Sequence, residues 1–156
     1  MDSEKIGPAL GRIPSGIYIL TAHHEGEDIG MLASFVEQAA FEPPMVTVSV
    51  GSGRRMEEAL DTGCEFGINI VGEQSAHLIK PFAKSGVTSP FEGLALVDNQ
   101  WYLPQLEEAL AFLVCRVDQP IVAGDHTVYT AEVIDAELQK DDESPMVRIR
   151  KNGFQY

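Results

Sequence analysis

The sequence predicts a mainly β protein, an antiparallel barrel with a few short peripheral helices. About seven segments are rich in β-branched and aromatic residues, a composition typical of strands. Most follow one another through short polar turns, which favours hairpins and leaves no room for helical crossovers throughout. The 156 residues contain no fixed repeat and no low-complexity linker, so we expect a single domain over residues 1–156.

The elements follow from local composition. Strands are expected at residues 16–22, 29–41, 45–50, 66–71, 111–117, 126–134 and 146–150. Short helices are expected at residues 3–12, 54–60 and 73–82, the first of them broken by Pro8 or beginning after it. Pro43 and Pro44 end the second strand, which is expected to be bent, because neither can donate to a ladder. Residues 118–125, with Pro120 and Gly124, are expected to form a hairpin connection, and the long connection 84–100 is of a kind that is often functional.

Charge and cysteine content exclude several classes of function. Eleven Lys and Arg against 24 Asp and Glu give a formal net charge of −13, so nucleic acid and anionic membrane surfaces are poor partners. Cys64 and Cys115 form no C-x-x-C pair, and the N-terminus has no basic start followed by an apolar segment. We therefore expect a reduced, cytoplasmic protein without a metal site.

One segment could bind an anion. Gly51-Ser52-Gly53-Arg54-Arg55 follows the clearest strand and opens a predicted helix, and it places two of the few cations together. It is not a dinucleotide fingerprint, because Met56 stands where the third glycine would be. The alternative is an ordinary glycine turn with solvated arginines.

Histidines and serines carry little signal by themselves. His126, in Gly124-Asp125-His126, could orient or protonate a substrate, but a turn aspartate beside a surface histidine explains the pattern equally simply. His23 and His24 have no third ligand at metal-binding spacing, and no serine lies in a Gly-x-Ser-x-Gly elbow.

Several segments, read in order, resemble the flavin reductase-like, FMN-binding split-barrel family. They are residues 12–21, Gly-Met-Leu-Ala-Ser-Phe at 30–35 followed by Phe-Glu-Pro-Pro-Met-Val at 41–46, Phe-Gly-Ile-Asn-Ile-Val at 66–71, Gly-Asp-His at 124–126 and the tail 145–156. The resemblance covers nearly the whole chain. It is greatest to the reductase-type domain at the end of cyanobacterial flavodiiron proteins, which here would stand alone.

The resemblance implies an enzyme that passes hydride from NADH or NADPH to FMN, with FAD also possible, and a homodimer with FMN near the subunit interface. It implies a catalytic role for His126 beside the nicotinamide or flavin edge. It also implies flavin contacts for Leu32, Ala33, Ser34, Phe35, Ser49, Val50, Gly51, Ser52, Arg54, Arg55 and Asn69. Within this set Ser52, Arg54 and Arg55 would hold the phosphate. Arg148, on the expected terminal strand, is expected to lie outside the site.

The sequence departs from the family pattern at two positions. Many of these reductases carry Thr-Ala-Ser-Ser, whereas Leu32 and Phe35 here replace the threonine and the second serine, so two hydroxyl contacts are missing. Two other functions remain open. One is an electron-transfer flavoprotein whose tightly bound FMN is reduced by a protein partner, and the other is a non-enzymatic heme-binding module that uses one of the four histidines.

Overall fold

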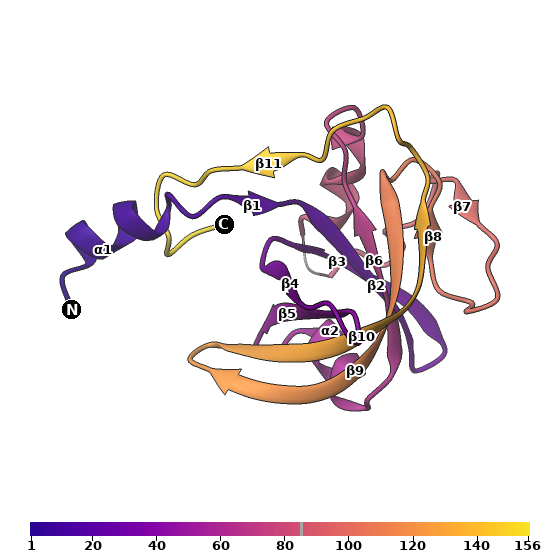
Figure 1. Cartoon of the computed structure of the whole chain (residues 1–156), viewed down its shortest axis with the longest axis horizontal. Coiled ribbons are helices and arrows are strands. Elements are labelled where there is room, and N and C mark those ends of the chain that lie inside the picture. The colour runs from indigo at the N-terminus through magenta and orange to yellow at the C-terminus, as the bar shows by residue number, and fades with distance from the viewer. Residues whose placement is uncertain (85) are drawn as a thin grey trace.

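The computed structural model describes residues 1–84 and 86–156 and is built around one antiparallel sheet (Figure 1). Seven strands pair in the order β3-β2-β6-β9-β10-β5-β4. They are β2 (Tyr18–His24), β3 (Glu27–Ala33), β4 (Val36–Ala40), β5 (Met45–Gly51), β6 (Glu65–Ile70), β9 (Ala111–Ala123) and β10 (His126–Leu138). All neighbours are antiparallel, which confirms the mainly β fold class.

The other elements are short. They are α1 (Ser3–Leu10), α2 (Arg55–Asp61), the 3₁₀ turns η1 (Ala76–Leu78) and η2 (Lys80–Phe82), and the two-residue strands β1 (Ser15–Gly16), β7 (Leu96–Val97), β8 (Gln105–Leu106) and β11 (Val147–Arg148). No helix in the described part of the chain is long and apolar enough to cross a membrane.

The sheet curls until its two edges meet. The edge strands β3 and β4 are consecutive in the chain and are joined only by Ser34 and Phe35, which we call the seam. The ladder of β3 with β2 ends at Ala33, and the ladder of β4 with β5 begins at Val36. The expected bend within residues 29–41 is therefore a break, because the chain changes from one edge of the sheet to the other.

The main core lies inside this curl and is closed by α2. Strand β5 alternates, so that Val48 and Val50 are buried while Ser49 faces the other way. Met56, Ala59 and Leu60 of α2 are buried in the same cluster. Burial of Met56 and of Leu60 stabilises the fold by roughly 1.5–3 kcal/mol each, which fixes α2, and the turn before it, against the barrel.

The structure corrects three expectations about local structure. The hairpin connection predicted at residues 118–125 is present but shorter, residues 124–125 alone, because β9 runs on to Ala123; Pro120 is tolerated because that half of β9 pairs with β10 alone. Residues 73–82 form two 3₁₀ turns instead of one helix, because Pro81 cannot continue an α-helical ladder. The first helix runs through Pro8, with Asp2 accepting a hydrogen bond from the Lys5 N–H at its start.

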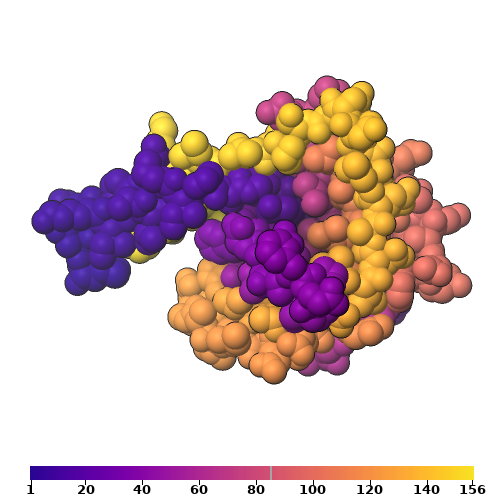
Figure 2. Space-filling model, viewed as in Figure 1, coloured from indigo at the N-terminus to yellow at the C-terminus, as the bar shows by residue number. Residues whose placement is uncertain are grey.

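An arm extends from the barrel. It consists of α1, the pair β1–β11 and the C-terminal residues, and both chain ends lie on it (Figures 1 and 2). Gly153 donates its N–H to the Gly7 carbonyl at 2.7 Å, so the tail is bound to the first helix. Exposed apolar side chains gather on this arm, among them Ile13, Val147 and Ile149.

Candidate functional site

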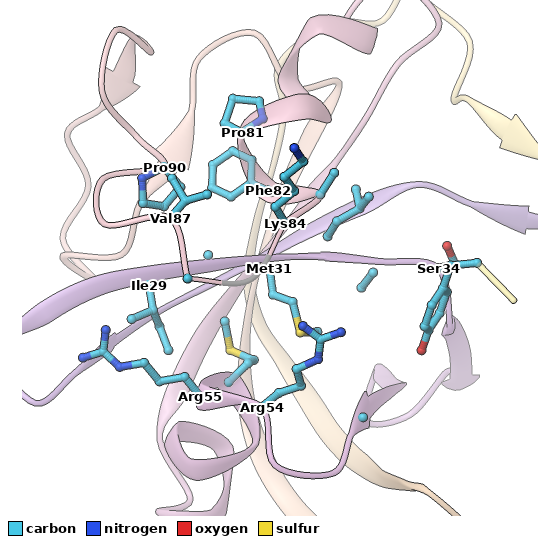
Figure 3. A pocket seen from close by; sticks show the side chains of 18 of the residues that line it. Ile29, Met31, Ser34, Arg54, Arg55, Pro81, Phe82, Lys84, Val87 and Pro90 are labelled. Carbon is cyan, nitrogen blue, oxygen red and sulfur yellow. The ribbon is translucent and has the colours of Figure 1, made fainter.

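A cavity of about 960 Å³ runs along the free edge of β3 (Figure 3). Residues of β3 and the seam form its floor, because no strand among the described residues pairs with the edge of β3 that faces away from β2. The turn between β5 and α2 lines one side, and residues 81–84 and 86–91 line the other. Asp125, His126, Arg148 and Tyr156 complete the lining. Residue 85 lies outside the described part of the chain.

Two motifs that are 70 residues apart in the sequence lie side by side in this cavity. In the ladder between β5 and β10, Gly51 is paired with His126. Beyond the ladder, Ser52 donates its N–H to the Asp125 carbonyl at 2.9 Å. Gly124 has a φ of +64°, which allows the tight turn that starts β10 at His126. The sheet register therefore brings the glycine–arginine turn and the Gly-Asp-His turn together.

Because Gly51 has no side chain, space remains between Arg54 and His126. A Cβ atom at this position would lie 3.8 Å from Arg54 Cγ and 3.9 Å from His126 Nε2. A side chain here would therefore fill the space between the two groups. With glycine, the cavity keeps a cradle there with a guanidinium on one side and an imidazole on the other.

Glu57 organises the turn before α2. Its carboxylate accepts hydrogen bonds from Gly53 N at 2.6 Å and from Thr127 Oγ1 at 2.7 Å. The hydrogen bond from Thr127, followed by that from the Gly53 N–H, lowers the pKa of Glu57. One amide group of the turn is thus already satisfied by the protein itself, and an incoming anion would rely on the arginines more than on this N–H.

The two arginines have different surroundings. Arg55 forms an ion pair with Glu27, with 2.7 Å between Nη1 and Oε2. Arg54 has no ion-pair partner among the described residues, and it points into the middle of the cavity beside Met31 (Figure 3). Arg54 is therefore the guanidinium of this pair that is available to an anionic ligand.

Aromatic groups gather at the seam end of the cavity. The ring centroid of Phe35 lies 5.8 Å from that of His126 and 5.7 Å from that of Tyr156. Asp125 Oδ1 lies 2.7 Å from His126 Nδ1, and Tyr156 Oη lies 2.5 Å from His126 Nε2. A carboxylate only accepts, so the Nδ1 proton points to Asp125, and in the tautomer that leaves Nε2 without a proton this atom accepts a hydrogen bond from Tyr156. The hydrogen bond with His126, followed by its charge, lowers the pKa of Asp125, and burial raises the pKa of Tyr156.

The opposite wall depends on a glycine in β3. Phe82 and Phe91 pack edge to face with ring centroids 5.2 Å apart. A Cβ atom at Gly30 would lie 2.5 Å from Phe82 Cε1 and 3.0 Å from Phe91 Cζ. Only glycine lets both rings approach the strand this closely, so Gly30 positions the wall formed by residues 81–84 and 86–91.

Ten of the twelve predicted site residues line the cavity. They are Leu32, Ala33, Ser34, Phe35, Ser49, Gly51, Ser52, Arg54, Arg55 and His126. Val50 does not, since alternation along β5 turns its side chain into the core. Asn69 is fully buried and binds backbone instead: its Oδ1 accepts from Leu106 N at 2.8 Å, and its Nδ2 donates to the carbonyls of Ile19 and Pro104. Asn69 therefore fastens the 104–106 segment to the barrel.

Sequence reasoning missed several lining residues. Arg148, expected outside the site, lines the cavity, as do Met31, Phe82, Phe91 and Tyr156. The long glycine- and proline-containing connection was a usable signal for the wall. No local signal placed Tyr156 beside His126, because that contact depends on the path of the arm.

The donor set suits a flavin nucleotide. Leu32, Phe35 and Phe82 offer apolar surface to a ring system, and the free edge of β3 offers backbone hydrogen-bonding groups to the edge of such a ring. Arg54 and Arg148 provide positive charge for a phosphate. Among the described residues no group of three or more His, Cys, Asp or Glu is placed to hold a metal ion.

The chain is similar to known proteins over most of its length. The chain is 35% identical over 137 residues to the reductase component of a 4-nitrophenol 4-monooxygenase/4-nitrocatechol 2-monooxygenase of Rhodococcus opacus, with 88% of this chain and 73% of that one covered. It is 35% identical over 162 residues to diflavin flavoprotein A 1 of Synechocystis sp., with 100% of this chain and 28% of that protein covered. The chain thus spans about a quarter of the length of the diflavin flavoproteins that it matches.

A solved structure and a family profile complete the comparison. The styrene monooxygenase flavin reductase of Pseudomonas putida S12 superposes with a TM-score of 0.79 at 30% identity, with 91% of this chain and 90% of that one covered. The profile of the flavin reductase like domain matches residues 10–155. On this match, which includes the strands, the seam and both turns of the cavity, the chain belongs to the flavin reductase like domain family.

Proposed function

We propose that the protein is an NAD(P)H-dependent flavin reductase that uses FMN. The observation that carries the proposal is the meeting, in one cavity, of the apolar side chains of Leu32, Phe35 and Phe82 with Arg54, which has no ion-pair partner among the described residues. Apolar walls suit a planar ring system, and the guanidinium suits the phosphate attached to it. When bound, the flavin supplies the redox chemistry, accepting hydride from a reduced nicotinamide.

The protein's part in this reaction is to bind and orient. Leu32, Ala33, Ser34 and Phe35 hold the ring system against the free edge of β3, and Ser52 and Arg54 hold the phosphate. A cavity of about 960 Å³ is at the upper end of the volumes typical of ligand pockets, so it has room for a nicotinamide beside the flavin ring. Holding two reacting rings together replaces a bimolecular encounter with a pre-oriented one.

His126 acts at the edge of the rings. Its Nδ1 is held by Asp125, so the imidazole is fixed and Nε2 is the atom that faces Tyr156 and the cavity. A protonated imidazole would complement the negative charge that reduction adds to the ring system. His126 thus has a catalytic role in the proposal, and Tyr156 positions it.

The proposal includes a homodimer built on the arm. Val147 is 62% exposed and Ile149 61% exposed, although both are aliphatic. Exposed apolar side chains clustered on one projecting element are typical of association surfaces. A second copy would bury them and would also hold the arm, from which Tyr156 reaches the cavity.

Anaerobic titration tests the proposed activity. Purified protein supplied with FMN should show flavin absorbance, and NADH or NADPH should bleach it. Bleaching by dithionite but by neither nucleotide would contradict the reductase activity. Reduction by a ferredoxin system alone would favour the electron-transfer flavoprotein, and a heme spectrum in fresh protein would favour the binding module.

A further inference from the structure

One end of the cavity is not used by the residues assigned to the flavin. Those residues lie at the seam and at the turn before α2, whereas the cavity continues along β3 to Glu27. The seven residues of β3, at about 3.3 Å per residue, give this edge a length of about 23 Å. The far end therefore has its own lining, formed by Glu27, Asp28, Ile29, Arg55, Val87 and Pro90.

Apolar side chains flank this end on two sides. In Figure 3, Val87 and Pro90 lie on one side of the β3 ribbon, and Ile29 lies on the other side near Arg55. A flat, largely apolar group lying along the free edge of the strand would contact both sides. This lining is suited to a base such as adenine.

Charged groups at the same end favour a hydroxyl over a phosphate. The Arg55 guanidinium is already paired with the Glu27 carboxylate at 2.7 Å. Asp28 is on the opposite face of β3 from Glu27, and its Oδ1 lies 3.0 Å from Nδ1 of His23. The side chain of Lys84 points away from Arg54 and Arg55 (Figure 3). A carboxylate accepts a hydrogen bond from a ribose 2′-hydroxyl, whereas it repels a 2′-phosphate.

We propose that this end of the cavity is a subsite for the adenosine half of a dinucleotide, and that Glu27, by occupying Arg55, selects a free ribose 2′-hydroxyl and therefore NADH over NADPH. The inference rests on the proposed reductase activity and names its nucleotide. FAD carries the same adenosine half, so the experiment includes both sources. The side chains of Glu27 and Arg55 are 65% and 45% exposed, so solvent screening limits the expected selectivity to about tenfold.

The first measurement is kcat/KM with NADH and with NADPH, using FMN as acceptor. Wild type should favour NADH by about tenfold, and Glu27→Gln should raise kcat/KM for NADPH by about tenfold, because the released Arg55 can bind the 2′-phosphate. Adding Arg55→Ala to Glu27→Gln should abolish that gain. Glu58→Gln removes a carboxylate of the same kind from α2, outside the cavity lining, and should leave the ratio unchanged.

The second measurement needs no turnover. Calorimetry should show wild type binding ADP-ribose about tenfold more tightly than 2′-phospho-ADP-ribose, whereas Glu27→Gln should bind the two about equally. If ADP-ribose competes with NADH but not with FAD, the subsite belongs to the nicotinamide dinucleotide. If ADP-ribose competes with FAD, the subsite belongs to the flavin. A wild-type preference for the 2′-phosphate, or a preference for ADP-ribose that Glu27→Gln leaves unchanged, would overturn the inference. Absence of flavin reduction by either nucleotide would instead overturn the proposed activity.

Discussion

Arg54 and Arg55 are neighbours in the chain, yet their surroundings give them different tasks. Glu27 pairs with Arg55, whereas Arg54 points into the cavity next to the cradle at Gly51. An ion pair at the surface contributes little to stability, but it removes a guanidinium from the charges available to a ligand. Which of the two adjacent arginines is available to a ligand thus depends on Glu27, a residue of β3.

Arg54→Ala should weaken FMN selectively. A hydrogen bond to a charged group contributes about 1.5–3 kcal/mol, or roughly tenfold to a hundredfold in affinity. Riboflavin lacks the phosphate and should bind wild type and variant equally in a fluorescence titration. Arg148 cannot serve as the control because it lines the cavity. Arg116 pairs with Glu65 outside the cavity and serves as the control, so Arg116→Gln should leave FMN affinity unchanged. Equal FMN affinity of wild type and Arg54→Ala would mean that the phosphate lies elsewhere.

Glu57 makes the turn before α2 sensitive to acid. Its pKa is lower in the folded protein than in the unfolded chain, so its contribution to stability is present above the ordinary pKa of about 4.3 and is lost as pH falls through the lowered value. Urea unfolding at pH 7 should therefore show Glu57→Gln less stable than wild type, with the difference shrinking as the pH falls below 4. A difference that stays constant with pH would show that the carboxylate is not the group responsible.

At the scale of elements, the alternation of apolar and polar residues predicted most of the strands of the sheet. It did not predict the cavity wall formed by residues 81–84 and 86–91. Ser49 and Val50 illustrate the limit: the alternation of β5 was clear, and it should have excluded the Val50 side chain from the cavity. The role of Asn69 could not be predicted, because its partners lie 35 and more residues away. The contact of Tyr156 with His126 likewise depends on the path of the whole arm.

Gly30 is where the strand and the wall depend on each other. Gly30→Ala places a Cβ against Phe82 and Phe91, which must move away from β3. We expect a stable variant with flavin affinity reduced by roughly tenfold, since overpacking typically costs about 1–3 kcal/mol, and here the movable wall can absorb it. Gly26→Ala strains the backbone of a hairpin turn, where φ is +78°, without meeting a neighbouring atom, so it controls for a general loss of stability. Unchanged flavin affinity in Gly30→Ala would show that the wall does not contact the flavin.

Over the whole molecule, the cavity differs in charge from the rest of the surface. Four of the eleven Lys and Arg residues line it, namely Arg54, Arg55, Lys84 and Arg148, together with three acids, Glu27, Asp28 and Asp125. The lining is therefore near neutral or slightly positive in a chain of net charge −13. This contrast favours entry of anionic nucleotides at the cavity over binding elsewhere.

The arm decides whether one chain suffices for this site. Ile13 is 58% exposed and Ile149 is 61% exposed, so replacing both with Asp should leave a single chain folded while removing an association surface. Light scattering should give wild type twice the 17.0 kDa of the chain, and the double variant should give the single mass. We also expect weaker flavin binding in the variant, because the arm that carries Tyr156 loses its support. Leu96→Asp changes an exposed leucine of β7, on the opposite side of the molecule from the arm in Figure 1, and should remain dimeric. A wild type that is monomeric at micromolar concentration and binds flavin fully would contradict the proposed dimer and leave the cavity complete within one chain.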